Sequence, residues 1–119
     1  MTQEQKDLLI KDLCTRLPYG VRVEYNSCAC EVLSIDRYHE ELTIRICPGY
    51  CPVVKLENIK PFLFPLLSMT MDQGQQWHKY ANDRGGLALS TDWLNAHYFD
   101  YRGLIPKGLA NDATGLNIY

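Results

Sequence analysis

The spacing of the apolar side chains changes at Val21, and this change constrains the fold more than any other feature of the chain. Before Val21, apolar residues recur every three or four positions, the spacing that gathers them on one side of a helix. After it, Val21, Val23 and Tyr25 alternate with polar residues, which is typical of a strand with one buried face. The sequence therefore predicts an α+β fold, in which a helix precedes a sheet.

We expect the N-terminal helix over residues 3–16. Thr2 and Gln5 match a capping box, in which each side chain accepts a hydrogen bond from the other residue's backbone N–H. Pro18 and Gly20 end the helix. Five residues form its apolar stripe, which we expect to face the sheet: Leu9, Ile10, Leu13, Cys14 and Leu17.

Four strands are predicted in the next part of the chain. They cover Val21–Tyr25, Cys28–Ile35, Leu42–Cys47 and Pro52–Glu57. Opposed residues of neighbouring strands must share a face, so we expect Ile35 opposite Leu42 and Leu33 opposite Ile44. The following hairpin continues this apolar face with two further pairs, Ile44 with Val54 and Leu42 with Leu56. A meander of short strands over residues 21–64 indicates a small SH3-like antiparallel barrel or sheet.

Residues 66–110 are predicted to be helical and to lie against the sheet. One helix runs from a cap at Ser68 or Thr70 to about Asp83, and Arg84–Gly86 breaks it. A second helix covers Asp92–Tyr101 with Ser90 or Thr91 as its cap, and residues 104–109 form a last turn or short helix. Residues 111–119 are expected to be a partly mobile tail. The 119 residues thus make one domain, with residues 1–20 as its N-terminal helical part.

Charge and hydropathy argue against two classes of partner, nucleic acids bound non-specifically and membranes. The 12 Lys and Arg against 14 Asp and Glu argue against a strong non-specific nucleic-acid binder, because such affinity comes mainly from neutralised phosphates. A local patch of Arg22, Arg37, Arg45 and Lys55 stays open. The apolar stretch Pro61–Leu67 is far shorter than the ~20 residues that span a bilayer. With a polar start and no export signal, we expect a cytoplasmic protein without membrane contact.

The five cysteines permit two interpretations. An odd number without an export signal disfavours a disulfide framework. The predicted register gathers Cys28, Cys30, Cys47 and Cys51 at one end of the sheet, on the face away from the apolar set. Four thiols suit a tetrahedral zinc site, but these spacings are less diagnostic than paired Cys-X2-Cys motifs, and small buried side chains are the favoured explanation. We assign no metal ligand and no cofactor.

Catalysis is not predicted. Nucleophilic catalysis by a thiol requires a nearby imidazole with an orienting group, and spacing specifies no such partner for His39, His78 or His97. A small Cys/His enzyme would need a cleft that joins a thiol to an imidazole. We keep it as an alternative to a non-catalytic protein.

The aromatic segment of residues 93–101 supplies the candidate binding residues. A helix would place Trp93, His97 and Asp100 on one side, and it would bury more than one face. The segment either docks on the sheet and the preceding helix, or it presents a partner-binding surface, where Trp, Tyr and Arg are common anchors. The candidate residues are Trp93, His97, Tyr98, Asp100, Tyr101 and Arg102.

Three stretches, Asp92–His97, Phe99–Ile105 and Lys107–Ala110, resemble the C-terminal signature of a family of small uncharacterised proteins from gut bacteria and their prophages. Leu17–Val21 and Ile59–Pro61 are also similar to that family, so the resemblance covers most of the chain. It implies a phage-related or mobile-element setting, and it implies no activity and no functional residue.

The sequence therefore favours a non-catalytic binding or adaptor module of a phage-like or mobile-element system. Its partner is expected to be another protein. A nucleic-acid-binding accessory protein is the first alternative, and the small enzyme is the second. Oligomeric state is left open by the sequence.

Overall fold

The computed structural model describes residues 1–81 and 86–119, with side chains described outside residues 81–89. The break predicted at Arg84 and Gly85 lies outside the described residues. The helices are α1 (Gln3–Arg16), α2 (Met71–Ala81) and α3 (Gly86–Ala96). The strands are β1 (Arg22–Tyr25), β2 (Cys28–Asp36), β3 (Glu41–Arg45), β4 (Val53–Lys55), β5 (Lys60–Pro65), β6 (Phe99–Asp100) and β7 (Asn111–Asp112). Short 3₁₀ turns are η1 (Leu17–Tyr19), η2 (Leu56–Asn58) and η3 (Leu66–Ser68).

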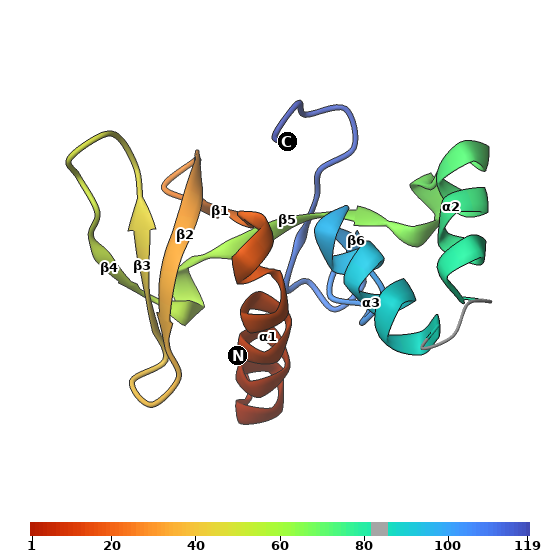
Figure 1. Ribbon diagram of the computed structural model, residues 1–119. Coiled ribbons are helices and arrows are strands. Elements are labelled where there is room, and N and C mark those ends of the chain that lie inside the picture. Colours follow the sequence, from red (N-terminus) through yellow and green to blue (C-terminus); the bar gives the residue numbers. More distant parts are fainter. Residues whose placement is uncertain (82–85) are drawn as a thin grey trace.

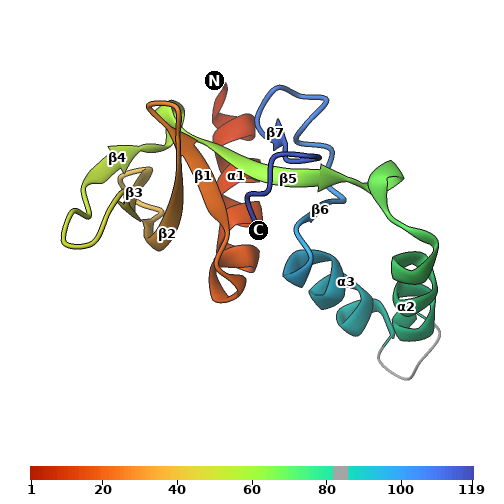
Figure 2. The same ribbon diagram turned by 90° about the horizontal axis from the view of Figure 1, so that it is seen from above.

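The α+β class is confirmed, but the sheet does not close into an SH3-like barrel. Its order is β4-β3-β2-β1-β5-β6, with β7 also paired to β5. The first four strands form the predicted antiparallel meander, whereas β6 and β7 join β5 in parallel. Closure fails because β5 leaves β1 after two residue pairs and continues toward α2 and α3 (Figures 1 and 2).

The register differs from the predicted one in two places. Ile35 lies opposite Leu42 as expected, but Leu33 is the extra residue of a β-bulge, and Val32 takes its place opposite Ile44. In the next hairpin, Leu42 faces Val54 instead of Leu56. This shift of two residues keeps the same side chains on the core face, because side chains alternate with a period of two.

Helix α1 matches its predicted bounds and packs its stripe into the main core. The capping box is present, with Thr2 N–H donating to Gln5 Oε1 at 3.0 Å and Gln5 N–H donating to Thr2 Oγ1 at 3.2 Å. Leu9, Ile10 and Leu13 are buried among apolar residues of the meander. Their burial from water is the main stabilising contribution to this part of the fold.

A buried ion network joins α1 to the C-terminal part of the chain. Asp12 and Arg16 are both 0% exposed, and the Asp12 carboxylate accepts from Arg16 Nε at 2.9 Å and from Arg102 Nη1 at 2.8 Å. Arg16 Nη2 also donates to the Phe99 carbonyl at 2.6 Å. The guanidinium of Arg102 lies 4.6 Å from the Tyr101 ring centroid. Neither Asp12 nor Arg16 was predicted to be buried.

The helix expected over residues 92–101 is wrong at both ends, because α3 begins at Gly86 and stops at Ala96. Tyr98 has φ +61, a left-handed conformation that ends a helix. The Tyr98 carbonyl then accepts from Phe64 N–H at 2.8 Å, so residues 99–100 become β6 on β5. Trp93, Leu94 and Phe99 form a second, smaller core with four partly buried neighbours: Phe64, Met69, Trp77 and Tyr101.

Part of the predicted tail joins the sheet. Asn111 and Asp112 form β7 on β5, and Ala113 is buried. Tyr119 donates its phenolic hydroxyl to the Phe62 carbonyl at 2.9 Å and accepts from Arg22 N–H at 2.9 Å. This tail therefore completes the sheet.

The ion network predicts a large loss of stability when its acid is removed. Asp12→Ala leaves the Arg16 charge buried without its acid, so we expect the free energy of unfolding in urea to fall by about 3–5 kcal/mol. Asp12→Leu combined with Arg16→Met should recover much of this loss, since apolar replacements of a buried pair are well tolerated. The exposed Asp7→Ala on the same helix is the control, with a change within about 0.5 kcal/mol. An equal effect of Asp7→Ala and Asp12→Ala would contradict the network's role.

Tyr119 predicts a stability change at alkaline pH. Burial of the phenol raises its pKa above the ordinary value of about 10, so the folded state keeps a proton that the unfolded state loses. The contribution of Tyr119 is therefore complete below pH ~10 and decreases as the pH rises above it. Urea unfolding at pH 8 to 11 should show a steeper loss for the wild type than for Tyr119→Phe. The exposed Tyr38→Phe should keep the wild-type profile.

Candidate functional site

An apolar groove lies between the end of β5, α2 and α3. It encloses about 350 Å³ and is lined by Leu66, Met69, Gly74, Trp77, His78, Leu94 and Tyr101. Two parts of the chain that are separate in sequence, residues 66–78 and residues 94–101, therefore contribute to it. A concave, mainly apolar site with few polar groups is the usual form of a binding pocket.

The local sequence explains why this part of the chain is apolar. Residues 61–71 contain no charged side chain. Thr70 then caps α2, with Gln73 N–H donating to Thr70 Oγ1 at 3.2 Å and Thr70 N–H donating to Gln73 Oε1 at 2.9 Å. The helix start is thus fixed immediately after η3, and it places Met69 and Gly74 at the groove.

The apolar surface extends beyond the groove. Leu67 is 100% exposed and Met71 is 83% exposed. A second hollow of about 220 Å³ lies beside the first and shares Leu66 with it. We call the two hollows, with the fully exposed Leu67 that lines the second, the apolar surface. Contiguous exposed apolar areas on a folded chain commonly mark interaction sites.

The second hollow presents little free charge. Its lining consists of Pro65, Leu66, Leu67, Asp100, Gly103, Ile105 and Pro106. Asp100 is buried, and its two carboxylate oxygens accept from the backbone N–H groups of Leu104 and Ile105, each at 2.8 Å. The carboxylate therefore fixes the turn after β6 and is already hydrogen-bonded within the chain.

Three side chains with polar groups line the groove: Tyr101, Trp77 and the exposed His78, whose ring centroid lies 5.2 Å from that of Trp77. Tyr101 donates its hydroxyl to Asn95 Oδ1 at 3.0 Å, which fixes the ring as part of the wall. The indole Nε1 of Trp77 is buried and has no hydrogen-bond partner within the described part of the chain. A buried donor without an acceptor is energetically unfavourable.

The six predicted binding residues do not form one surface. Trp93 is 7% exposed and stacks on Phe99 at a centroid distance of 5.7 Å, so its role is packing. His97 stacks on Trp93 at 4.1 Å. The predicted helical face that joins His97 to Asp100 does not exist, because α3 ends before both residues. Asp100 caps a turn, and Tyr98, Tyr101 and Arg102 contact Tyr119, Asn95 and Asp12, respectively.

Only Tyr101 of these six residues lines the groove. The sequence reasoning missed the groove's other walls, which come from Leu66, Met69, Trp77 and Leu94. The available signal was the uncharged run of residues 61–71, which ends in adjacent leucines and two methionines. It indicated apolar character and gave no information on which of these side chains stay exposed.

The four strand cysteines do not gather on one face of the sheet as the predicted register required. Cys30 is buried on the core face, whereas Cys28, Cys47 and Cys51 are exposed. The bulge at Leu33 is the cause, since one extra residue reverses the faces of the strand before it. Burial, followed by the charge of the Cys28 thiolate, raises the pKa of the Cys30 thiol.

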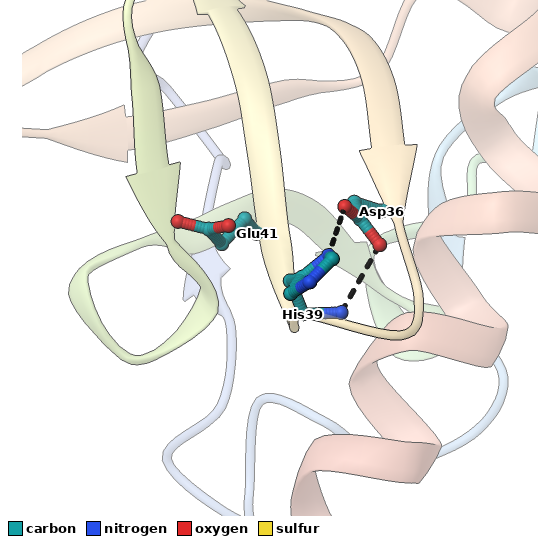
Figure 3. Close-up of side chains that lie close together, drawn as sticks. All are labelled: Asp36, His39 and Glu41. Carbon is teal, nitrogen blue, oxygen red and sulfur yellow. Dashed lines mark hydrogen bonds and ion pairs between the residues drawn. The ribbon is translucent and has the colours of Figure 1, made fainter.

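Within the described residues, one group of His, Cys, Asp and Glu side chains is close enough to share a cation (Figure 3). Asp36, His39 and Glu41 lie at the β2–β3 turn, with ligand atoms within 4.8 Å of one another. Asp36 already accepts from His39 Nδ1 at 2.7 Å, and Glu41 pairs with Lys55 at 3.3 Å. Hydrogen bonds from the His39 backbone and side chain lower the pKa of Asp36. The turn itself thus accounts for this arrangement.

The basic residues predicted to form one patch are interrupted by acids. Glu31 lies between Arg22 on β1 and Arg45 on β3 in the sheet register, and Arg45 donates to it at 3.0 Å. Lys55 is paired with Glu41. This alternation opposes a nucleic-acid interface, because phosphate binding requires uncompensated positive charge.

No family model, curated protein or solved structure matches the chain. In the described part of the chain, every helix is too short or too polar to cross a bilayer.

The cysteine positions predict unequal thiol reactivity. Cys28, Cys47 and Cys51 should react with a disulfide reagent within minutes in the folded protein. Cys30 should react only on unfolding, because it is buried and its raised pKa reduces the reactive thiolate. Mass spectrometry of the labelled peptides assigns each site. Equal labelling of Cys28 and Cys30 in the folded state would contradict the placement of Cys30 in the core.

Proposed function

We propose that this chain is a non-catalytic protein-binding or adaptor module whose partner docks on the apolar surface. Full exposure of Leu67 beside an apolar groove is the observation that carries this proposal. Leu67 is not needed to fill either core, so its burial in a complex would be a net gain. A phage-like or mobile-element setting is part of the proposal and rests on the sequence resemblance alone.

The chemistry of the apolar surface defines the partner. Its lining contains no Lys, Arg or Glu, its one Asp is already hydrogen-bonded, and its one His, His78, is exposed. A charged side chain would lose its water there and find no permanently charged partner. The partner therefore presents an uncharged apolar segment, with a large side chain that enters the groove between Trp77 and Tyr101.

Such contacts contribute a substantial part of the free energy of binding. Burial of one large apolar side chain contributes about 1.5–3 kcal/mol, and a few such anchors usually dominate an interface. Leu67 on one side and the groove on the other supply two such contacts.

Gly74 offers a variant that separates binding from folding. A Cβ at this position would meet only Met69 Sδ, at 4.0 Å, so the helix accepts a side chain there. Gly74→Leu should fill the groove and also favour the helix by about 1 kcal/mol. Loss of binding together with unchanged or raised stability would then arise from the blocked groove and not from misfolding.

The test begins with a photo-crosslinking residue at position 67 in the native host, with position 116 as the control. Leu116 is also exposed, but it lies in the segment after β7. We expect the partner captured through position 67 to bind Leu67→Ser and Gly74→Leu at least ~10-fold more weakly than wild type. Leu116→Ser should bind normally. Equal capture at both positions, or full affinity of Gly74→Leu, would refute this docking surface.

A further inference from the structure

The pairing of β1 with β5 contains a gap that a side chain fills. The two strands pair at Val23 with Pro61 and at Glu24 with Lys60. Arg22 and Phe62 would form the next pair in this register. Instead, the Tyr119 hydroxyl lies between them, accepting from Arg22 N–H and donating to the Phe62 carbonyl, each at 2.9 Å.

This gap is selective for a hydroxyl group. One partner is a donor and the other is an acceptor, so the group between them must accept and donate at once. A phenol does both. A ring without the hydroxyl would leave both backbone groups unpaired, and sites built around a hydroxyl discriminate strongly against analogues that lack it.

The ring of Tyr119 has aromatic walls that belong to other parts of the chain. It stacks on Tyr98 with centroids 3.6 Å apart and an interplanar angle of 9°, and Phe64 lies 6.2 Å away. Tyr98 is fixed independently, because its hydroxyl donates to the Tyr19 carbonyl. The walls and the hydrogen-bonding groups therefore do not depend on the tail.

Between Ala113 and Tyr119 the tail has few other attachments. Residues 114–117 are exposed, and the Asp112 side chain and the Ala113 carbonyl accept from Thr114 N–H and Leu116 N–H within the tail. Tyr119 supplies the hydrogen bonds that join the end of this chain to β1 and β5. In Figure 2 the last residues lie beside these two strands.

We propose that this gap, lined by Arg22, Phe62, Phe64 and Tyr98, is a phenol-binding site. Tyr119 is its internal ligand, and an external phenol group enters when Tyr119 is absent or displaced. The group can come from a free small phenol or from a tyrosine side chain of another polypeptide. This inference is independent of the apolar surface, which shares none of these residues.

The test uses Tyr119→Ala, which empties the site, and compares p-cresol with toluene. We expect p-cresol near 10 times its Kd to raise the melting temperature of Tyr119→Ala by about 5 °C. Toluene at the same concentration should change it by less than 1 °C, and Tyr119→Phe should not respond to p-cresol because its own ring fills the site. An equal response to toluene and p-cresol, or none to either, would overturn the proposal.

A second arm separates the two sources of the phenol. The peptide Thr-Gly-Leu-Asn-Ile-Tyr, which copies residues 114–119, should stabilise Tyr119→Ala at lower concentration than p-cresol if a polypeptide tyrosine is the preferred ligand. The same peptide ending in Phe should be inactive. A peptide weaker than p-cresol would support the free phenol as the ligand, and equal activity of the Tyr and Phe peptides would overturn the proposal.

If Tyr119→Ala does not fold, hydrogen exchange tests whether the Tyr119 hydroxyl fills the gap between Arg22 and Phe62. Tyr119→Phe keeps the ring and removes only the hydroxyl. We expect the Arg22 amide to exchange at least ~10-fold faster in this variant than in the wild type, with the Val23 amide as the internal reference. Unchanged protection of Arg22 would show that the hydroxyl does not fill the gap, and it would overturn the proposal.

Discussion

The carboxylate of Asp12, shared by Arg16 and Arg102, is the interaction on which the arrangement of the chain depends. It joins the first helix to a segment more than 80 residues later, and Arg16 extends the connection to the Phe99 carbonyl of β6. Since β6 pairs with β5, the network positions the second core relative to the first. Both guanidinium groups approach the Tyr101 ring, so the same charges also fix a wall of the groove. Removing one partner of such a buried pair costs much more than replacing both.

Local signals in the sequence predicted the elements that depend on local interactions. Helix α1 has its cap and stripe within 16 residues, and the four strands of the meander have clear alternation. The network was not predictable in this way, because Asp12 and Arg16 are four apart and resemble an exposed ion pair on a helix. The helix expected over residues 92–101 failed for the same reason. Its second half is drawn into a parallel pair with β5, and this distant contact outweighs helix propensity.

A single extra residue in β2 explains both the register difference between β2 and β3 and the separation of the cysteines. The bulge at Leu33 reverses the faces of the strand before it, so Cys30 enters the core and the thiols separate. Nothing in the local sequence marks Leu33 as a bulge. The aromatic segment left two interpretations open, packing and partner binding. Trp93, Asp100 and Arg102 fix the segment itself, through stacking on Phe99, backbone hydrogen bonds and the Asp12 carboxylate, respectively.

Strand β5 connects the two proposed binding features, because it changes partner along its length. It pairs with β1 at Lys60 and Pro61, with β7 at Phe62 and Leu63, and with β6 at Phe64 and Pro65. Where the neighbour along one edge of a strand ends, the backbone hydrogen bonds on that edge are interrupted, and the groups at the interruption need another partner. At Phe62 the phenol of Tyr119 fills it. Strand β5 ends at Pro65, and Leu67 lies exposed to solvent beside the groove. Both proposed binding features therefore arise because the sheet stays open and does not close into the predicted barrel.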